Sequence, residues 1–327
     1  MGAIFCSYQN LLNTLLDVVV IKTGLVITED ELIDFLQEDF PEEEMFKIVN
    51  RENIIRIRSE QFDFYCLFLR RKLGELEEIN QFGHFGFRMA KWLNKGYDPV
   101  EVLKKLMELI AEEHEKDKMK PVDPILILEK AVKLKLAPRK MLFDAMHSLI
   151  EDQKNSNTIF PVEEIMWDGG IKLSTLFNSE SKPKSDDEYI DQKFINFLAA
   201  NPSKLEFMHW RNFERLTAEF FKREGYKVEL GTGGNDGGID LRVYNGNESS
   251  PYIIVQCKRN KELNQVKIET VKSFYTDVEF EGAKKGLIAT TSKIALGGKK
   301  VCSIRKYPLE FAENAEIKQW VNKMKKR

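Results

Sequence analysis

Three polar side chains lie at the ends of two strand-like runs in the C-terminal half of the sequence. The first run, "GIDLRVY", opens with Asp240 near its start, and the second, "YIIVQCK", ends in Gln256 and Lys258. Because alternate side chains of a strand share a face, Gln256 and Lys258 are predicted to point the same way, with Cys257 pointing opposite into packing. A buried strand rarely ends in an amide and an ammonium on one face unless a polar partner lies there.

The chemistry that suits these side chains is binding of a hard cation. Residues 245–251 are polar or turn-forming, so a hairpin would place Asp240 beside Gln256 and Lys258. Magnesium prefers oxygen ligands, and the set offers the Asp240 carboxylate, the Gln256 amide oxygen and the backbone carbonyl of Cys257. Lys258 would hold and help deprotonate an attacking water and would stabilise charge on phosphorus oxygens. The pattern therefore predicts a magnesium-dependent hydrolase.

The elements around these residues predict a mixed α/β domain. An amphipathic helix, "HWRNFERLTAEFFKREG", is followed by the strand-like runs "YKVEL", "GIDLRVY" and "YIIVQCK". A second helix, "NQVKIETVKSFYTDVEF", and a further strand, "KGLIATTS", come next. This order of one helix, three strands, one helix and one strand is typical of a compact domain with a mixed sheet.

A glycine-rich stretch, "GTGGNDGG", leads into the first of the two polar runs. Its glycines most simply allow a sharp turn, and no G-K-[ST] follows at the spacing of a phosphate-binding P-loop. Asp236 within it is predicted to be a turn residue, and contact with a metal through water is the alternative.

These motifs resemble the Mrr-type catalytic domain, a branch of the PD-(D/E)xK nuclease superfamily, over residues of about 205–292. The resemblance rests on "FE" in the first helix, on "GGNDGGID" and on "QCK" in place of the commoner ExK. It implies a restriction-endonuclease-like fold and metal-dependent cleavage of DNA, with Mg²⁺ as cofactor and Mn²⁺ as a substitute. It also implies that Glu214 joins Asp240, Gln256 and Lys258 as a catalytic residue and approaches the metal, directly or through water. A role in restriction or anti-phage defence follows from the same resemblance.

One departure from the family pattern follows Thr291. The family continues there with a helix, whereas this chain has "SKIALGGKK", in which Gly297 and Gly298 are expected to interrupt it.

The charges divide the chain into two halves of opposite sign. Residues 191–327 hold 25 basic and 17 acidic residues, a net of +8, and residues 1–190 hold 25 basic and 35 acidic residues, a net of −10. The basic half is the better candidate for binding a polyanion, and the acidic half favours a protein partner. Three parts are predicted: an acidic, mainly helical regulatory or partner-binding region at 1–177, a linker at 178–189 and the nuclease domain at 190–327.

Helix signals dominate the first part. Thr28 and Glu31 have capping-box spacing, Asp98-Pro99 and Asp123-Pro124 open two further amphipathic runs, and "NIIRIRS" alternates like a short strand. A winged helix before residue 60 is one alternative, and a small helical domain of another kind is the other.

Cysteine spacing and hydropathy indicate in which compartment the protein is expected and whether it spans a membrane. Four scattered cysteines form no C-x-x-C pair, so neither a disulfide framework nor a zinc site is expected, and a cytoplasmic location is predicted. The apolar stretch 11–27 contains Asn13, Asp17 and Lys22 and is too polar to span a membrane.

Two readings of function remain open at this stage. The first is a DNA endonuclease, for which cutting both strands with one site per chain favours a homodimer. The alternative is a nuclease-fold subunit of a defence complex that mainly binds nucleic acid or a protein partner.

Overall fold

The computed structural model groups the chain into two compact units, one of Met1–Glu77 with Asp168–Arg327 and one of Glu78–Trp167. It describes residues 3–76, 92–93, 95–116, 122–154, 169–183, 185, 187–234, 238–246, 248–261 and 263–326. The fold is mixed α/β with a helical N-terminal region, as the sequence predicts. No helix in the described ranges is long and apolar enough to cross a membrane.

A five-stranded mixed sheet forms the centre of the C-terminal part of the first unit. Its strands are β5 (Lys227–Leu230), β6 (Leu241–Tyr244), β7 (Ile253–Lys258), β8 (Lys285–Thr290) and β9 (Leu309–Ala312), in that spatial order. Strands β5, β6 and β7 are antiparallel neighbours, whereas β8 and β9 continue the sheet in parallel with β7. The predicted hairpin between the two polar runs is confirmed, because Leu241 of β6 pairs with Val255 of β7.

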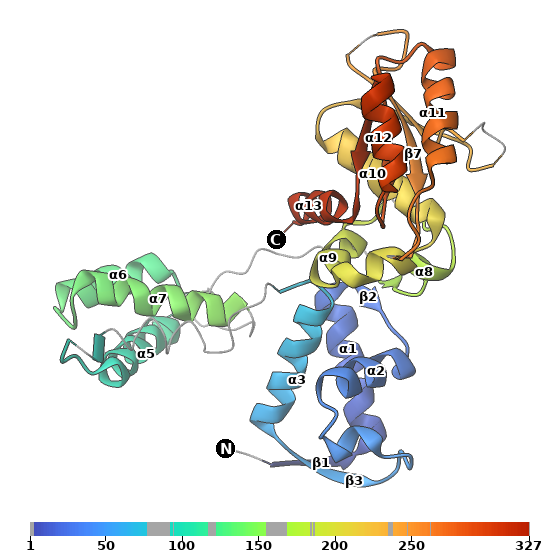
Figure 1. Ribbon diagram of the computed structural model, residues 1–327. Helices are drawn as coiled ribbons and strands as arrows, with labels where there is room; N and C mark the ends of the chain where they lie inside the picture. Colours follow the sequence, from blue (N-terminus) through green and yellow to red (C-terminus); the bar gives the residue numbers. More distant parts are fainter. Residues whose placement is uncertain are drawn as a thin grey trace. The chain divides into compact units, whose positions relative to one another are not determined.

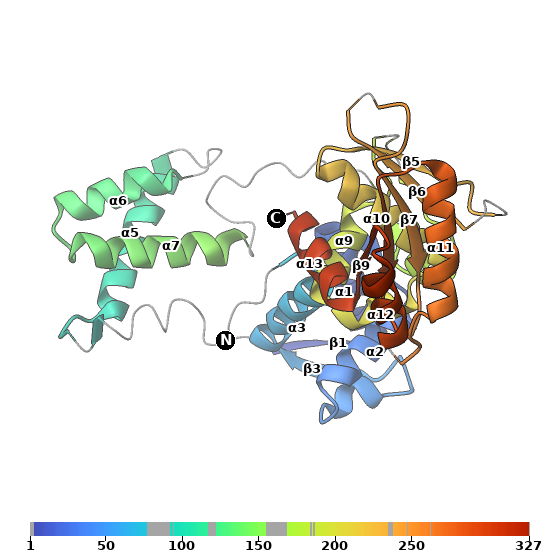
Figure 2. The ribbon, with the colours of Figure 1, turned by 45° about the horizontal axis from the view of Figure 1, so that its top comes forward.

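Helices cover both faces of this sheet. Helix α10 (Trp210–Arg223) lies on one side of β6 and β7, and α11 (Ile268–Glu281) lies on the other (Figure 2). Val255 of β7 belongs to the same core cluster as residues of α10, whereas its neighbour Ile254 packs in the cluster of α11. The strand is therefore buried on both faces, which explains its continuous apolar run.

The expected interruption after Thr291 is wrong, because helix α12 (Leu296–Arg305) runs through both glycines. Gly298 is buried, and a Cβ atom there would lie 2.9 Å from Val271 Cγ2 of α11. Glycine therefore allows α12 to pack closely on α11, and the contacts outweigh its low helix propensity. Strand β9 and helix α13 (Asn314–Met324), which the sequence did not reveal, complete the domain.

The N-terminal part of the first unit is mainly helical. Its elements are β1 (Ala3–Ser7), α1 (Tyr8–Thr23), β2 (Leu25–Val26), α2 (Glu29–Asp39), the 3₁₀ helix η1 (Glu44–Lys47), β3 (Ile54–Arg58) and α3 (Ser59–Lys72). Helices α1 and α3 contact each other along their length (Figure 1). The predicted capping box of α2 is confirmed, with Glu31 N–H donating to Thr28 Oγ1 and Thr28 N–H donating to Glu31 Oε2. The predicted strand at 53–59 is β3, which pairs with β1.

A third group of elements joins this helical part to the sheet. It comprises β4 (Ile171–Lys172), α8 (Thr175–Asn178), α9 (Gln192–Ala200) and the 3₁₀ helix η2 (Pro202–Phe207). One of the hydrophobic core clusters of the unit extends from the helical part to the sheet and includes Leu12 of α1, Phe194 of α9 and Phe213 of α10. The chain between α8 and α9 contacts α10, since Ser181 N–H donates to Asn212 Oδ1 at 2.8 Å. The compact units thus differ from the predicted division at 178–189, and independent folding of 190–327 stays a prediction.

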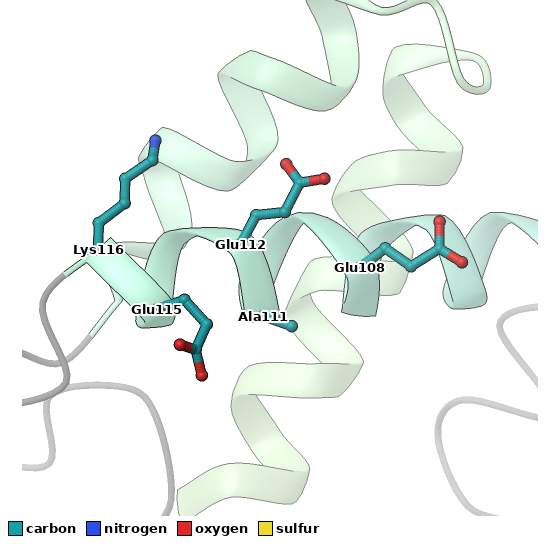
Figure 3. Close-up of a pocket in the computed structure, with 5 residues that line it drawn as sticks. All are labelled: Glu108, Ala111, Glu112, Glu115 and Lys116. Atoms are coloured by element: carbon teal, nitrogen blue, oxygen red, sulfur yellow. The ribbon is translucent and has the colours of Figure 1, made fainter.

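The second unit is built from α5 (Pro99–Lys116), α6 (Pro124–Lys133) and α7 (Arg139–Lys154), with its own core around Leu106 and Ile127. The predicted helix starts are confirmed, because Asp123 Oδ1 accepts the Ile125 N–H and Asp98 Oδ1 accepts the Val100 N–H. Glutamates project from α5 around a shallow surface hollow: Glu108, Glu112 and Glu115 (Figure 3). They form no metal-binding group of three within the described part of the chain.

Candidate active site

Asp240 is fixed against the end of β7 by two hydrogen bonds. Its N–H donates to the carbonyl of Val255 at 2.9 Å, and its Oδ2 accepts the N–H of Cys257 at 2.6 Å. The hairpin therefore places the carboxylate beside the residues of the "QCK" motif, and not merely on a neighbouring strand.

The carbonyl of Cys257 leaves β7 on the same edge as Asp240. The N–H and C=O of one strand residue point to the same edge, and the Cys257 N–H meets Asp240. The Cys257 side chain packs toward the core beneath α10, as predicted, and burial raises the pKa of its thiol well above the usual range. Cys257 therefore offers the site a backbone oxygen and no thiolate.

Gln256 is buried and carries an oxygen without a partner. Its side-chain Nε2 donates to the carbonyl of Gly238 at 2.9 Å. Because a carbonyl oxygen can only accept a hydrogen bond, the amide atom that faces it must be the nitrogen. The remaining atom, Oε1, is buried and accepts no hydrogen bond from the described residues. Gly238 has φ +87°, and a Cβ atom there would lie 3.0 Å from Gln256 Nε2, so the turn fits glycine.

Glu214 projects from α10 into the same region and is 5% exposed. Its Oε2 accepts a hydrogen bond from Arg211 Nη1 at 2.7 Å. Burial, followed by the nearby Asp240 carboxylate, raises the pKa of Glu214 to about 7, although Arg211 acts in the opposite direction. Two carboxyl groups, Glu214 and Asp240, thus share a poorly solvated space, which a cation would favour.

Arg211 is a member of this cluster that the sequence did not single out. It is 8% exposed, and besides Glu214 it donates from Nη2 to the carbonyl of Gly231 at 2.7 Å. Helix α10 is thereby tied to the start of the glycine-rich stretch. The signal in the sequence is the Arg–Glu pair three residues apart on one helix face, which is common on exposed helices.

Lys258 ends β7 and lies on the same strand face as Gln256, by the alternation of side chains. Its backbone is held by Thr290 of β8, whose hydroxyl donates to the Lys258 carbonyl at 2.7 Å. Across the described ranges, no carboxylate lies within 4.0 Å of its ammonium group. The ammonium is therefore not committed to a structural ion pair.

The donor set fits a hard divalent cation. No group of three His, Cys, Asp or Glu side chains gathers in the described part of the chain, so a site of carboxylates alone is absent there. Two carboxyl groups, a strand-end carbonyl and a buried amide oxygen that accepts no hydrogen bond from the described residues are oxygen groups of the kind that Mg²⁺ prefers. Asp236, a further candidate, lies outside the described residues.

A restriction-endonuclease family model matches the part of the chain that contains the candidate site. Residues 205–321 match the Mrr_cat family model, described as a restriction endonuclease, which extends the predicted range of 205–292 through α12 and β9 into α13. A solved structure of the MspJI restriction endonuclease in complex with a 27-mer oligonucleotide is similar at 18% identity and a TM-score of 0.32. The similarity covers 44% of this chain and 35% of that one, so this chain spans about a third of its length. No curated protein matches the sequence. At residues 205–321, this chain therefore contains a restriction-endonuclease-type nuclease domain of the Mrr_cat family.

Proposed function

We propose that the protein is a Mg²⁺-dependent DNA endonuclease, with Mn²⁺ as a substitute. The observation that carries the proposal is the buried Oε1 of Gln256, which accepts no hydrogen bond from the described residues, on the strand end where the Cys257 N–H donates to the Asp240 carboxylate and where Lys258 lies. An unsatisfied buried acceptor costs about 1–3 kcal/mol unless a ligand compensates it. A bound cation would supply that compensation.

Each residue has a distinct role in the proposed reaction. Asp240, Gln256 and the Cys257 carbonyl would hold the ion, with Glu214 as a further ligand, directly or through water. The ion, when bound, lowers the pKa of water and stabilises charge on phosphate oxygens. Lys258 holds the attacking water, assists its deprotonation and stabilises the charge that develops on the phosphorus oxygens.

Arg211 is proposed to orient Glu214 and not to touch the substrate. Its guanidinium already donates to Glu214 and to the Gly231 carbonyl, which fixes the direction of the carboxylate. A rigid arrangement of ligands lowers the reorganisation needed when the ion binds.

DNA is the substrate that the charge and the family support. Residues 191–327 carry a net charge of +8, which attracts a phosphate backbone. We place the enzyme in restriction or anti-phage defence in the cytoplasm, acting as a homodimer because each chain has one site for two strands. The four cysteines, which are scattered along the sequence without a C-x-x-C pair, suit a reducing compartment.

The second candidate is a nuclease-fold subunit of a defence complex that chiefly binds nucleic acid or a protein partner. It is favoured by the acidic N-terminal half, which suits a protein better than DNA.

Incubation of the purified protein with supercoiled plasmid, phage DNA and modified DNA separates the two candidates. Nicked or linear products are expected with Mg²⁺ or Mn²⁺ and none in excess EDTA. DNA binding without cleavage of any substrate under all metal conditions would favour the binding subunit, and cleavage in EDTA would contradict the metal-dependent mechanism.

A further inference from the structure

A cavity of about 310 Å³ lies between α2 and the segment formed by Leu173, α8, α9 and η2, away from the candidate active site. Its apolar lining consists of one leucine and four phenylalanines: Phe35, Leu173, Phe177, Phe197 and Phe207. Phe35, Leu173 and Phe197 are buried in the core, whereas Phe207 is 50% exposed. Buried apolar and aromatic side chains beside one exposed ring are suited to contact with a ligand.

The rim of the cavity is acidic. Glu31, Asp34 and Glu38 line it from positions i, i+3 and i+7 of α2, which share one helix face. Asp34 and Glu38 are exposed, and Lys204 is the one basic residue in the lining. The cavity therefore combines aromatic rings with a net negative rim.

The acidity continues beyond the cavity along the same surface segment. Residues 29–44 contain nine acidic residues and no basic residue. Residues 1–77 as a whole hold 15 acidic and 8 basic residues, a net of −7, so most of the charge of the acidic half lies here. The negative electrostatic potential of these residues repels nucleic acid and attracts extended cationic segments.

The chain already contains one example of the matching chemistry at this place. The ammonium of Lys72 lies 5.9 Å from the centroid of the Phe35 ring, bonds Asp39 Oδ2 at 2.6 Å and contacts Glu38 Oε2 of the rim at 3.4 Å. A cation is thus held between an aromatic ring and a carboxylate of α2. Lysine and arginine side chains fit such a pocket because their aliphatic stems contact the rings while the charge meets the rim.

We propose that this cavity is a docking site for a basic peptide segment of a partner protein, with one Arg or Lys side chain inserted over the phenylalanines. The extended acidic surface favours a segment with several cations over a single small molecule.

A hydrogen bond links the wall of the cavity to the candidate active site. The carbonyl of Glu206, adjacent to Phe207 in η2, accepts a hydrogen bond at 3.2 Å from Arg259, which follows Lys258. Occupancy is therefore proposed to change DNA cleavage, and this second part rests on the proposed function.

The test uses the full chain and three probes. Binding is measured by fluorescence anisotropy with a fluorescein-labelled Arg-Leu-Arg-Phe-Arg-Leu peptide and a matched Glu-Leu-Glu-Phe-Glu-Leu peptide, and arginine methyl ester serves as competitor. The test variants are Asp34→Asn/Glu38→Gln and Phe207→Ala. Asp17→Asn/Asp30→Asn is the control, because it removes two exposed carboxylates outside the cavity lining.

Micromolar binding of the cationic peptide is expected, with at least a tenfold loss in Asp34→Asn/Glu38→Gln, a clear loss in Phe207→Ala and less than a twofold change in the control. Equal losses in the test and control pairs, or binding of the anionic peptide, would overturn the site. Displacement by arginine methyl ester at the peptide's own concentration would overturn the peptide as its occupant.

Plasmid cleavage with and without saturating cationic peptide tests the connection to the active site. At least a threefold change is expected in the wild type and none in Asp34→Asn/Glu38→Gln. Unchanged wild-type cleavage despite cavity-dependent binding would overturn the connection. Absence of cleavage under every condition, with cavity-dependent binding retained, would count against the proposed nuclease function and not against the docking site.

Discussion

The polar residues of the candidate site are held in place by two backbone groups and one buried arginine. Asp240 is fixed by the Cys257 N–H, Gln256 by the Gly238 carbonyl and Glu214 by Arg211. Such contacts orient ligands before an ion arrives, which is the function of outer contacts in metal sites. The residue that most directly reports on this arrangement is Gln256, because its Nε2 donates to the Gly238 carbonyl whereas its Oε1 accepts no hydrogen bond from any residue that the structure describes.

Substitutions of Gln256 are expected to separate its two roles. Gln256→Glu retains an oxygen ligand and should keep metal-dependent cleavage, with half-maximal activity at lower Mg²⁺. In EDTA it should lose about 1–3 kcal/mol of unfolding free energy, because an ionised carboxylate would face the Gly238 carbonyl without a donor. Gln256→Leu should lose metal-dependent cleavage. Metal titration of cleavage and urea unfolding measure these effects, and identical metal titrations for the two variants would show that Gln256 is no ligand.

Glu214 is expected to make the metal-free protein less stable as the pH rises. Its pKa in the folded chain is raised from the ordinary value of 4.5 to about 7. Between these values the folded state binds more protons than the unfolded state, so the unfolding free energy falls with rising pH, by on the order of 3 kcal/mol. Glu214→Gln should flatten this dependence in urea unfolding between pH 5 and pH 8 in EDTA. An unchanged slope in the variant would contradict the assignment.

The sequence predicted that Asp240 lies beside the end of β7, and it did not predict the contact that holds Glu214. Strand alternation and the hairpin were sufficient to bring Asp240 beside Gln256, and both features are local. The contribution of Arg211 could not be predicted, because an Arg–Glu pair on a helix is ordinarily exposed. Only the packing of α10 on the sheet buries Arg211 to 8% exposure and directs it to the Gly231 carbonyl.

Among the elements, α12 shows how packing can reverse the meaning of a sequence signal. Paired glycines predict an interruption of a helix, and for Gly297 and Gly298 that prediction is wrong. In the fold, Gly298 lies against Val271 of α11, and Gly297 lies on the exposed side. A side chain at position 298 would therefore collide with α11, whereas one at position 297 would not. Substitution by alanine can distinguish the two positions.

Gly298→Ala is expected to lower the unfolding free energy by about 1–2 kcal/mol, because the new methyl group would lie 2.9 Å from Val271 Cγ2 in a buried position. Gly297→Ala is the matched control: its methyl group would meet Ile268 Cδ1 at 3.6 Å, an ordinary contact. The control should be neutral or stabilising by up to about 1 kcal/mol, as helix propensity favours alanine. Equal effects of the two substitutions in urea unfolding would contradict the close packing of α12 on α11.

At the scale of the whole molecule, the core does not follow the division that composition suggests. Charge changes sign near residue 190, yet Leu12 and Phe194 share one core with Phe213 of the nuclease domain. Net charge is a surface property and carries no information on which apolar faces meet. By contrast, residues 78–167 have a separate core, although no change in composition marks their boundaries.

Two independent unfolding transitions are expected from the two cores. Leu106→Ala in the core of the second unit and Leu198→Ala in the core of the first each remove a fully buried side chain and should cost about 2–5 kcal/mol. Each variant should shift a different transition in differential scanning calorimetry and leave the other in place. A single transition that both variants shift together would show that the units unfold as one.

The central claim, that the end of β7 is a hydrolytic site, is tested most directly by comparing DNA cleavage by Lys258→Ala and Lys261→Ala with Mg²⁺. Both substitutions remove one positive charge from neighbouring positions, and Lys261 is exposed beyond the strand. Lys258→Ala should lower the cleavage rate at least about 100-fold, because the charge on the phosphorus oxygens loses its stabilising ammonium. Its DNA affinity in EDTA should stay within a few-fold of wild type, and Lys261→Ala should cleave at close to the wild-type rate. Cleavage by Lys258→Ala at the wild-type rate would contradict the assignment of the active site.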